Sequence, residues 1–82
     1  MTYLETIAHQ LSTAAVLLER AADMIDSAGQ TALNMRELTY GAQWRANAHR
    51  FRADAITVQS DSLRVRDIER DQLAAASETD QP

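Results

Sequence analysis

The sequence of 82 residues has no cysteine, one proline and two glycines, and aromatic residues make up 5% of it. The absence of cysteine excludes a disulfide framework and a thiolate metal site, so the fold must be held by packing alone. Two glycines are too few for a loop that cradles a phosphate group. The scarcity of aromatic residues disfavours a β-sheet core, whereas abundant alanine suits closely packed helices. The composition therefore predicts an all-α fold.

Residues suited to catalysis or metal binding are also scarce. His9 and His49 are the two histidines, and neither stands in the Glu-x-x-His spacing of carboxylate-bridged metal sites in helical bundles. The serines lack a histidine and an acid that would complete a nucleophilic constellation. We therefore expect no enzyme, no catalytic residue, no metal or cofactor site and no small-molecule substrate.

The N-terminal segment shows no basic region followed by a continuous apolar run. Neither a cleavable signal peptide nor a membrane span is therefore expected, which predicts a cytoplasmic protein. All eight basic residues are arginine. That choice is typical of a GC-rich genome and favours an actinobacterial source.

The middle of the chain is basic, and both ends are acidic. The basic stretch from Arg45 to Arg52 is interleaved with Trp44 and Phe51, which is a pattern that a dimeric nucleic-acid-binding regulator would use. The net charge of −4 disfavours that function. So do three acids of the first helix that can neutralise these arginines, namely Glu19, Asp23 and Asp26.

Two segments repeat apolar and small residues in alternating steps of four and three, which places each set along one side of an α-helix. The first set is Leu4, Ala8, Leu11, Ala15, Leu18, Ala22 and Ile25, and the second is Trp44, Ala48, Phe51, Ala55, Val58, Ser62 and Val65. We predict helix 1 at about 2–28, a turn region at 29–41 and helix 2 at about 42–75. Together they form one domain, residues 1–76, and residues 77–82 are expected to be a disordered polar tail.

The alternation of large and small residues predicts an antiparallel hairpin of two long helices. Pairing Ala22 with Phe51 and Leu18 with Ala55 keeps each layer similar in volume. In this register Trp44 is expected to lie over Gly29, where the missing side chain leaves room for the indole. A short helical turn from 35 to 39 is expected inside the connection, because Asn34 and Glu37 fit a capping box.

Apolar residues outside this packing are too many for one hairpin to cover. A broad apolar arc on a helix usually packs against further helices, so we predict a four-helix bundle formed by two hairpins. The expected interface residues are Leu17, Met24, Ile56, Leu63 and Ile68.

The stretch "WRANAHRF" resembles the turn motif of the Trp-x-Gly (WXG-like) family of small helical hairpins handled by type VII secretion systems. In that family a Trp-x-Gly sequence lies between two antiparallel helices, and small residues and an aromatic follow it, as Ala48 and Phe51 do here. We assign Gly29, Trp44, Ala46 and Phe51 to this turn motif. Ala46 stands at the family's glycine position, and the family's C-terminal Tyr-x-x-x-acid export signal is absent.

The resemblance implies a protein–protein association module, one subunit of a homodimer or a heterodimer. Its partner would be the chain itself or a second small helical protein, and export would proceed without a cleaved signal peptide. Two other functions stay open, namely a cytoplasmic or phage-derived helical adaptor and a dimeric nucleic-acid-binding regulator.

Overall fold

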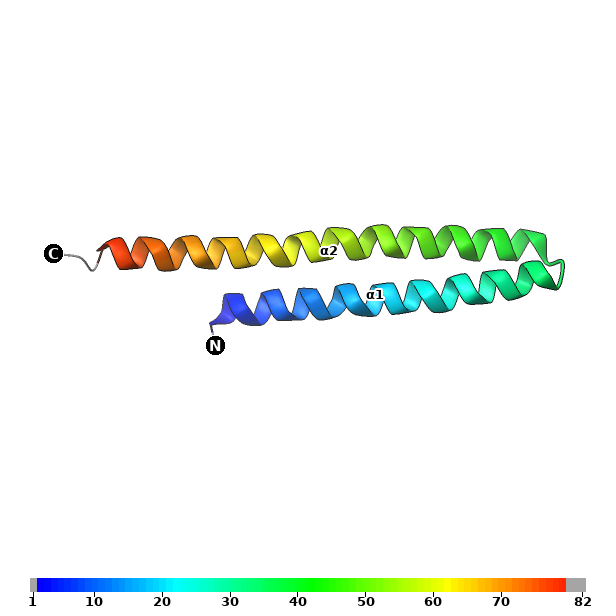
Figure 1. The fold of residues 1–82 in the computed structure, drawn as a ribbon, viewed down its shortest axis with the longest axis horizontal. Coiled ribbons are helices and arrows are strands. Elements are labelled where there is room, and N and C mark those ends of the chain that lie inside the picture. The colour runs from blue at the N-terminus through cyan, green and yellow to red at the C-terminus, as the bar shows by residue number, and fades with distance from the viewer. Residues whose placement is uncertain (1, 80–82) are drawn as a thin grey trace.

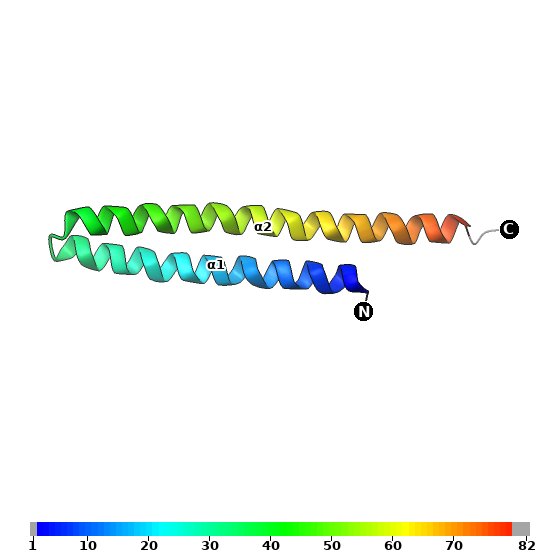
Figure 2. The ribbon, with the colours of Figure 1, turned by 180° about the vertical axis from the view of Figure 1, so that it is seen from behind.

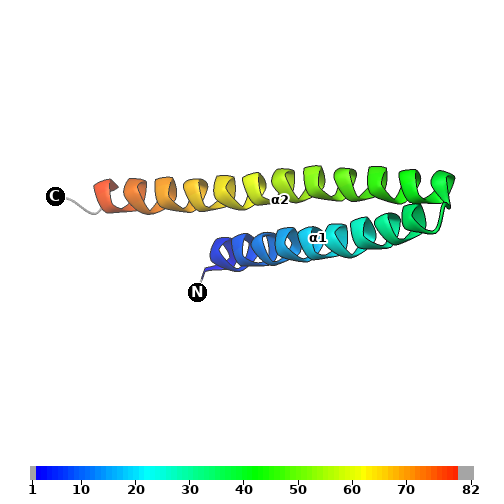
Figure 3. The same ribbon diagram turned by 45° about the vertical axis from the view of Figure 1, so that its right-hand side comes forward.

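The computed structural model describes residues 2–79, which form two antiparallel helices joined by a short turn (Figure 1). Helix α1 spans Tyr3–Asn34 and helix α2 spans Leu38–Thr79. The helices lie side by side from the turn to the start of α1 when seen from the front, from behind and after a 45° turn (Figures 1, 2 and 3). Helix α2 then continues past the N-terminus of α1. The prediction of an all-α helical hairpin is confirmed.

The predicted turn region at 29–41 is wrong, because the turn comprises only Met35–Glu37. Helix α1 continues through Gly29, and Gly41 already belongs to α2. Arg36 adopts the left-handed conformation (φ 65°), and the Glu37 amide donates to the Ala32 carbonyl at 2.8 Å. Arg36 thus adopts the left-handed conformation that glycine commonly adopts just after the end of a helix. The capping box expected at Asn34 and Glu37 does not form, since α1 includes Asn34 and α2 starts one residue after Glu37.

The predicted C-terminal boundary is also too early. Helix α2 continues to Thr79 rather than ending near 75. The run from Ala74 to Ala76 has high helix propensity, and no proline or glycine follows it within the helix. Residues 77–79 of the expected tail are therefore helical, while residues 80–82 lie outside the described part of the chain.

The two helices meet along rows of small residues that recur at every seventh position. These buried residues are Ala8, Ala15, Ala22 and Gly29 on α1, and Gly41, Ala48, Ala55 and Ser62 on α2; Glu69 continues the α2 row, and Ala32 is buried outside it. The large residues of both seams, such as Leu18 and Phe51, are only half-buried. Within residues 2–79 the largest fully buried side chain is that of Ser62. Because the residues in contact are small, the two helices approach closely. The large side chains therefore lie beside the line of contact.

The closest approach is at the turn end. A Cβ atom on Gly29 would lie 3.0 Å from the carbonyl oxygen of Gly41 and 3.2 Å from the backbone nitrogen of Arg45. The two backbones thus touch where Trp44 was expected to cover Gly29. That expectation is wrong, because no space remains for an indole, and Trp44 instead lies on one side of the hairpin with its ring 5.9 Å from that of Tyr40.

Polar contacts at the other end agree with the predicted register. The hydroxyl of Ser62 donates a hydrogen bond to the carbonyl oxygen of Ala8 at 2.7 Å and lies 3.0 Å from the hydroxyl of Ser12. The buried Ser62 hydroxyl therefore has hydrogen-bond partners. Serine can stand here, where the preceding layers of α2 have alanine, without leaving an unpaired polar atom.

We expect Ala22→Leu to lower the free energy of unfolding by about 1–3 kcal/mol, because Ala22 is fully buried and added bulk must separate the helices. Urea denaturation followed by circular dichroism measures this change. Ala53→Leu, at an exposed position of α2, is the matched control and should change stability by less than about 0.5 kcal/mol. Equal effects of the two substitutions would contradict the packing described.

Gly29→Ala should also destabilise the hairpin, by about 1–2 kcal/mol net. Alanine is intrinsically the better helix former by about 1 kcal/mol. Its Cβ, however, would lie 2.7 Å from the Cγ of Arg45, and behind that side chain it would meet backbone atoms of α2 that cannot rotate away. Thermal unfolding of this variant beside the unmodified protein tests the balance. A higher melting temperature for Gly29→Ala would mean that the backbones are not in contact.

Candidate association surface

Arginine and aspartate side chains bridge the helices along one side of the hairpin, which we call the charged face. The Nε of Arg45 donates to Asp26 at 3.2 Å, and Arg52 lies 3.0 Å from Asp23 and 3.5 Å from Asp26. Burial raises the pKa of Asp26, but the hydrogen bond from Arg45 and the charges of Arg45 and Arg52 outweigh it, so that this pKa lies below its ordinary value. Such exposed pairs add little stability, but they show which sides of the two helices adjoin.

These ion pairs bear on the nucleic-acid alternative. Arg45 and Arg52 belong to the basic stretch, and both are paired with acids of α1. A phosphate backbone would have to displace those carboxylates before it could bind the arginines. The pairing therefore disfavours a nucleic-acid-binding surface.

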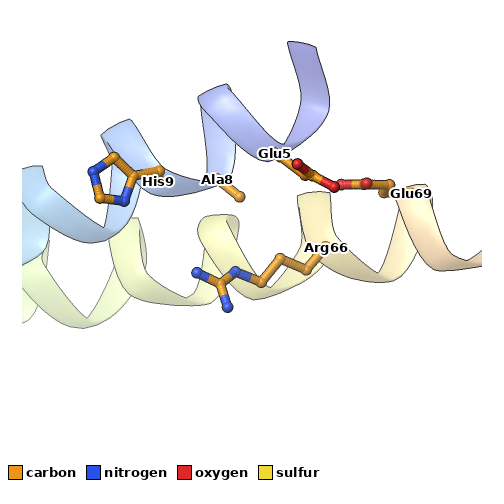
Figure 4. A pocket seen from close by; sticks show the side chains of 5 residues that line it. All are labelled: Glu5, Ala8, His9, Arg66 and Glu69. Carbon is orange, nitrogen blue, oxygen red and sulfur yellow. The ribbon is translucent and has the colours of Figure 1, made fainter. Parts of the chain in front are cut away.

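A pocket of about 400 Å³ lies at the open end of the charged face (Figure 4). The carboxyl groups of Glu5 and Glu69 point toward one another, whereas the His9 ring and the Arg66 guanidinium lie away from them. Glu69 occupies the seventh-residue position that is Gly, Ala or Ser in the preceding layers, and its side chain is buried there. Burial, followed by the neighbouring Glu5 carboxyl, raises the pKa of Glu69 above its ordinary value of 4.5.

The pocket does not amount to a metal site. Among the described residues, no three His, Cys, Asp or Glu side chains gather in a way that could hold a metal ion. Over the same part of the chain, neither helix is apolar enough along its length to cross a membrane. The remaining large feature of the surface is the side opposite the ion pairs.

That opposite side, which we call the apolar face, carries no charged residue on α1. At 100° per residue, the α1 positions turned away from the ion pairs form three rows, Tyr3–Gln10–Leu17–Met24–Thr31, Leu4–Leu11–Leu18–Ile25–Ala32 and Ile7–Ala14–Ala21–Ala28. All charged residues of α1 lie on its other side. From α2 the face receives the half-buried or exposed row Trp44, Phe51, Val58 and Val65.

The apolar face ends in a cleft of about 370 Å³ beside the turn. Trp44 and Tyr40 form its α2 side, and Met35 and Glu37 of the turn line its end. Its α1 side is formed by Ala28, Thr31 and Ala32. Met35 is 74% exposed and Tyr40 56% exposed, so large apolar side chains surround a space that this chain does not fill.

The structure divides the five predicted interface residues between two sides. All five are exposed. Leu17 and Met24 lie along the outer edge of the apolar face, and Ile68 lies on the same side of α2 as Tyr40. Ile56 and Leu63 follow the arginine row of α2 and belong to the opposite side. The five residues therefore do not form one continuous surface, and their role as an interface stays a prediction.

The predicted turn motif lies within helices. Gly29 is buried inside α1, whereas Trp44, Ala46 and Phe51 belong to α2 after the turn has ended. Trp44 is 39% exposed at the cleft, Phe51 is half-buried and Ala46 is exposed. The assignment of these residues to a turn is wrong, because the backbone contact at Gly29 lets both helices continue to residues 34 and 38.

Sequence reasoning missed the cleft and the buried acid. The seventh-residue pattern could have found both, because Glu69 continues the buried row of Ser62 and Tyr40 continues the row of Asp54 and Asp61 beyond the predicted start of helix 2. Tyr40 was missed because the turn was predicted to extend to residue 41, whereas Glu69 lay within the predicted helix 2 but was not recognised as part of its buried row.

We expect Glu69→Gln to make stability less dependent on pH. Because the folded protein holds the Glu69 proton more tightly than the unfolded chain, the unmodified hairpin gains stability through this group as the pH falls from 7 toward 4.5, and loses it as the pH rises through the raised pKa. Glu69→Gln should melt higher than the unmodified protein at pH 7, and this advantage should shrink at pH 4.5. Glu19→Gln, at an exposed position of α1, is the control. A constant difference across this pH range would contradict the role given to Glu69.

The chain matches no protein-family model, no curated protein and no solved structure. The resemblance to the Trp-x-Gly hairpins stays a prediction.

Proposed function

We propose that the protein is a protein–protein association module that contributes two helices to a larger helical bundle. The observation that carries this proposal is the core of the described hairpin, in which only small side chains and that of Glu69 are buried. Its leucines, isoleucines and aromatic residues line the two faces instead. A partner that covers them would complete a core that one hairpin leaves open.

Energetics support the same function. Full burial of a Leu, Ile or Phe side chain contributes about 1.5–3 kcal/mol of stability relative to exposure. The large side chains here are only partly buried, so each contributes only part of that stability. A chain of 82 residues has little other apolar surface to bury, which leaves a lone hairpin close to the limit of stability. Association adds the missing burial.

The association partner is proposed to be a second copy or another small helical hairpin, as in the Trp-x-Gly proteins that the sequence resembles. Chain length, hairpin topology and the Trp44-to-Phe51 spacing support the resemblance. Against it stand Ala46 in place of glycine and the position of Trp44 within α2. A role in type VII secretion is therefore proposed from the sequence motif alone. The proposed association with a partner rests instead on the large apolar side chains that the hairpin leaves exposed.

We expect the melting temperature of the purified chain to rise with its concentration between about 1 and 100 µM, because folding and association are linked by mass action. Circular dichroism at several concentrations and sedimentation equilibrium measure this together. A chain that instead stays poorly helical alone, and gains helicity with a co-expressed hairpin, would identify a different partner. A stable, fully helical monomer with a concentration-independent melting temperature would refute the proposal.

A further inference from the structure

We infer that the apolar face binds a helical chain other than a second copy, and that this partner places two basic side chains opposite Asp54 and Asp61. The inference rests on the proposed association function and adds the chemistry of the partner. It follows from two carboxylates that lie among uncharged residues on this face, and from the ways in which two identical faces can stack.

Asp54 and Asp61 lie on the α2 side of the apolar face. Each stands one position before a buried residue of α2, Ala55 or Ser62. The same row, at intervals of seven residues, starts at Tyr40, which lines the cleft of this face. The two aspartate positions are about 10.5 Å apart along the helix, because seven residues rise by 1.5 Å each.

Neither carboxylate has a cation as close as those on the charged face, where Asp23 lies 3.0 Å from Arg52. Asp61 is half-buried, and its own Arg64 is 3.9 Å away. Asp54 forms no ion pair within the described part of the chain. A partner that covers the face would remove water from both carboxylates, which is costly unless it also supplies positive charge.

Two-fold symmetry allows two copies of the face to stack in two ways. In the first, α1 of each copy lies on α2 of the other. Asp54 and Asp61 would then lie against the apolar side of α1, which holds no charged residue. Their desolvation would be uncompensated.

In the second way, α1 lies antiparallel on α1 of the other copy, and α2 on α2. This symmetry places each row of α2 against the same row of the other copy, wherever the axis stands along the helices. The row of Asp54 and Asp61 therefore faces itself, and so does the outer row of Arg50 and Arg64. Acids oppose acids and arginines oppose arginines, which disfavours a second copy as the partner.

A different chain is not bound by this symmetry and can place basic side chains where α2 carries acids. Two Lys or Arg residues at positions i and i+7 of an α-helix lie on one side and have the axial spacing of Asp54 and Asp61. The apolar residues of the same helix would complete the burial of half-buried side chains such as Leu18 and Phe51. The partner is thus an amphipathic helical chain with a basic edge.

The size of the face suits a stable complex. Helix α1 has 32 residues and is about 48 Å long at 1.5 Å per residue. With the hairpin width of 17 Å, the face projects to roughly 800 Å², which is about what each partner buries in a standard interface.

Removal of the two charges tests whether they oppose self-association. In sedimentation equilibrium the unmodified chain should dimerise only weakly, with a dissociation constant above about 10 µM. Asp54→Asn/Asp61→Asn should lower this constant by at least about tenfold, because neutral side chains cost less to desolvate. An asparagine variant that dimerises no more strongly than the unmodified chain would overturn the inference.

Glu19→Gln/Asp67→Asn is the matched control, because it removes the same charge from exposed positions outside the apolar face. Asp67 pairs with a residue three positions on, as Asp61 does, so each double variant loses one such pair. The control should change the dissociation constant by less than about threefold. A larger effect of the control than of Asp54→Asn/Asp61→Asn would place self-association on the charged face and overturn the inference. Circular dichroism at high concentration confirms that each variant still folds.

A copy of opposite charge tests the basic partner directly. Asp54→Arg/Asp61→Arg presents arginines in the row that faces the acids when α1 packs on α1. Mixed with the unmodified chain, it should form a 1:1 complex with a dissociation constant at least about tenfold below that of the unmodified chain with itself. Native mass spectrometry separates the mixed complex by mass, and sedimentation equilibrium of the mixture gives the constant.

Glu19→Arg/Asp67→Arg has the same net charge and is the control for this mixture. It should bind the unmodified chain within about threefold of the strength with which that chain binds itself, because Asp54 and Asp61 would still lack a cation. No mixed complex with Asp54→Arg/Asp61→Arg, or one that the control forms equally well, would contradict the inferred partner.

Failures of the two proposals are distinguishable. Strong self-association that does not depend on Asp54 and Asp61 would overturn the basic partner and leave the association function intact. A stable helical monomer that binds neither copy, with a melting temperature independent of concentration, would refute both.

Discussion

The close contact between the two helices is the constraint on which the rest of the structure depends. Alanine, glycine and serine at every seventh position let the backbones meet, with a glycine on each helix at the closest point. No large residue fits on that line. The large side chains must therefore lie beside it, and on α1 the apolar residues lie mainly to one side while all the charged residues lie to the other. The apolar face and the charged face both follow from this one contact.

Much of the fold could be predicted from the sequence, because it depends on periodicity. The seam from Leu4 to Ile25 and that from Trp44 to Val65 fix two helices, and the alternation of large and small fixes their antiparallel register. The turn could not be predicted, because Gly29 has two possible uses. A glycine can end a helix through its conformational freedom or allow close approach through its missing side chain, and only the position of the partner backbone decides between them.

The candidate surface was harder to predict for a related reason. Leu17 and Ile56 both lie outside the main seams, so the sequence alone predicts both as interface residues and does not show that they lie on different sides. Which residues share a side depends on how the helices are rotated about their contact line. The contacts of Arg45 with Asp26 and of Ser12 with Ser62 show that rotation, which places Ile56 and Leu17 on different sides of the hairpin.

The unequal lengths of the helices determine how the molecule opens. Helix α2 has 42 residues and α1 has 32, so the C-terminal end of α2 extends past the N-terminus of α1 (Figure 1). A lone helical segment shorter than about 12 residues is marginal in water, and its amides should exchange with solvent first. The glycine contact beside the turn holds the opposite end together. Fraying therefore proceeds in one direction, from the carboxylate pair toward the turn, and gives the hairpin a gradient of local stability along its length.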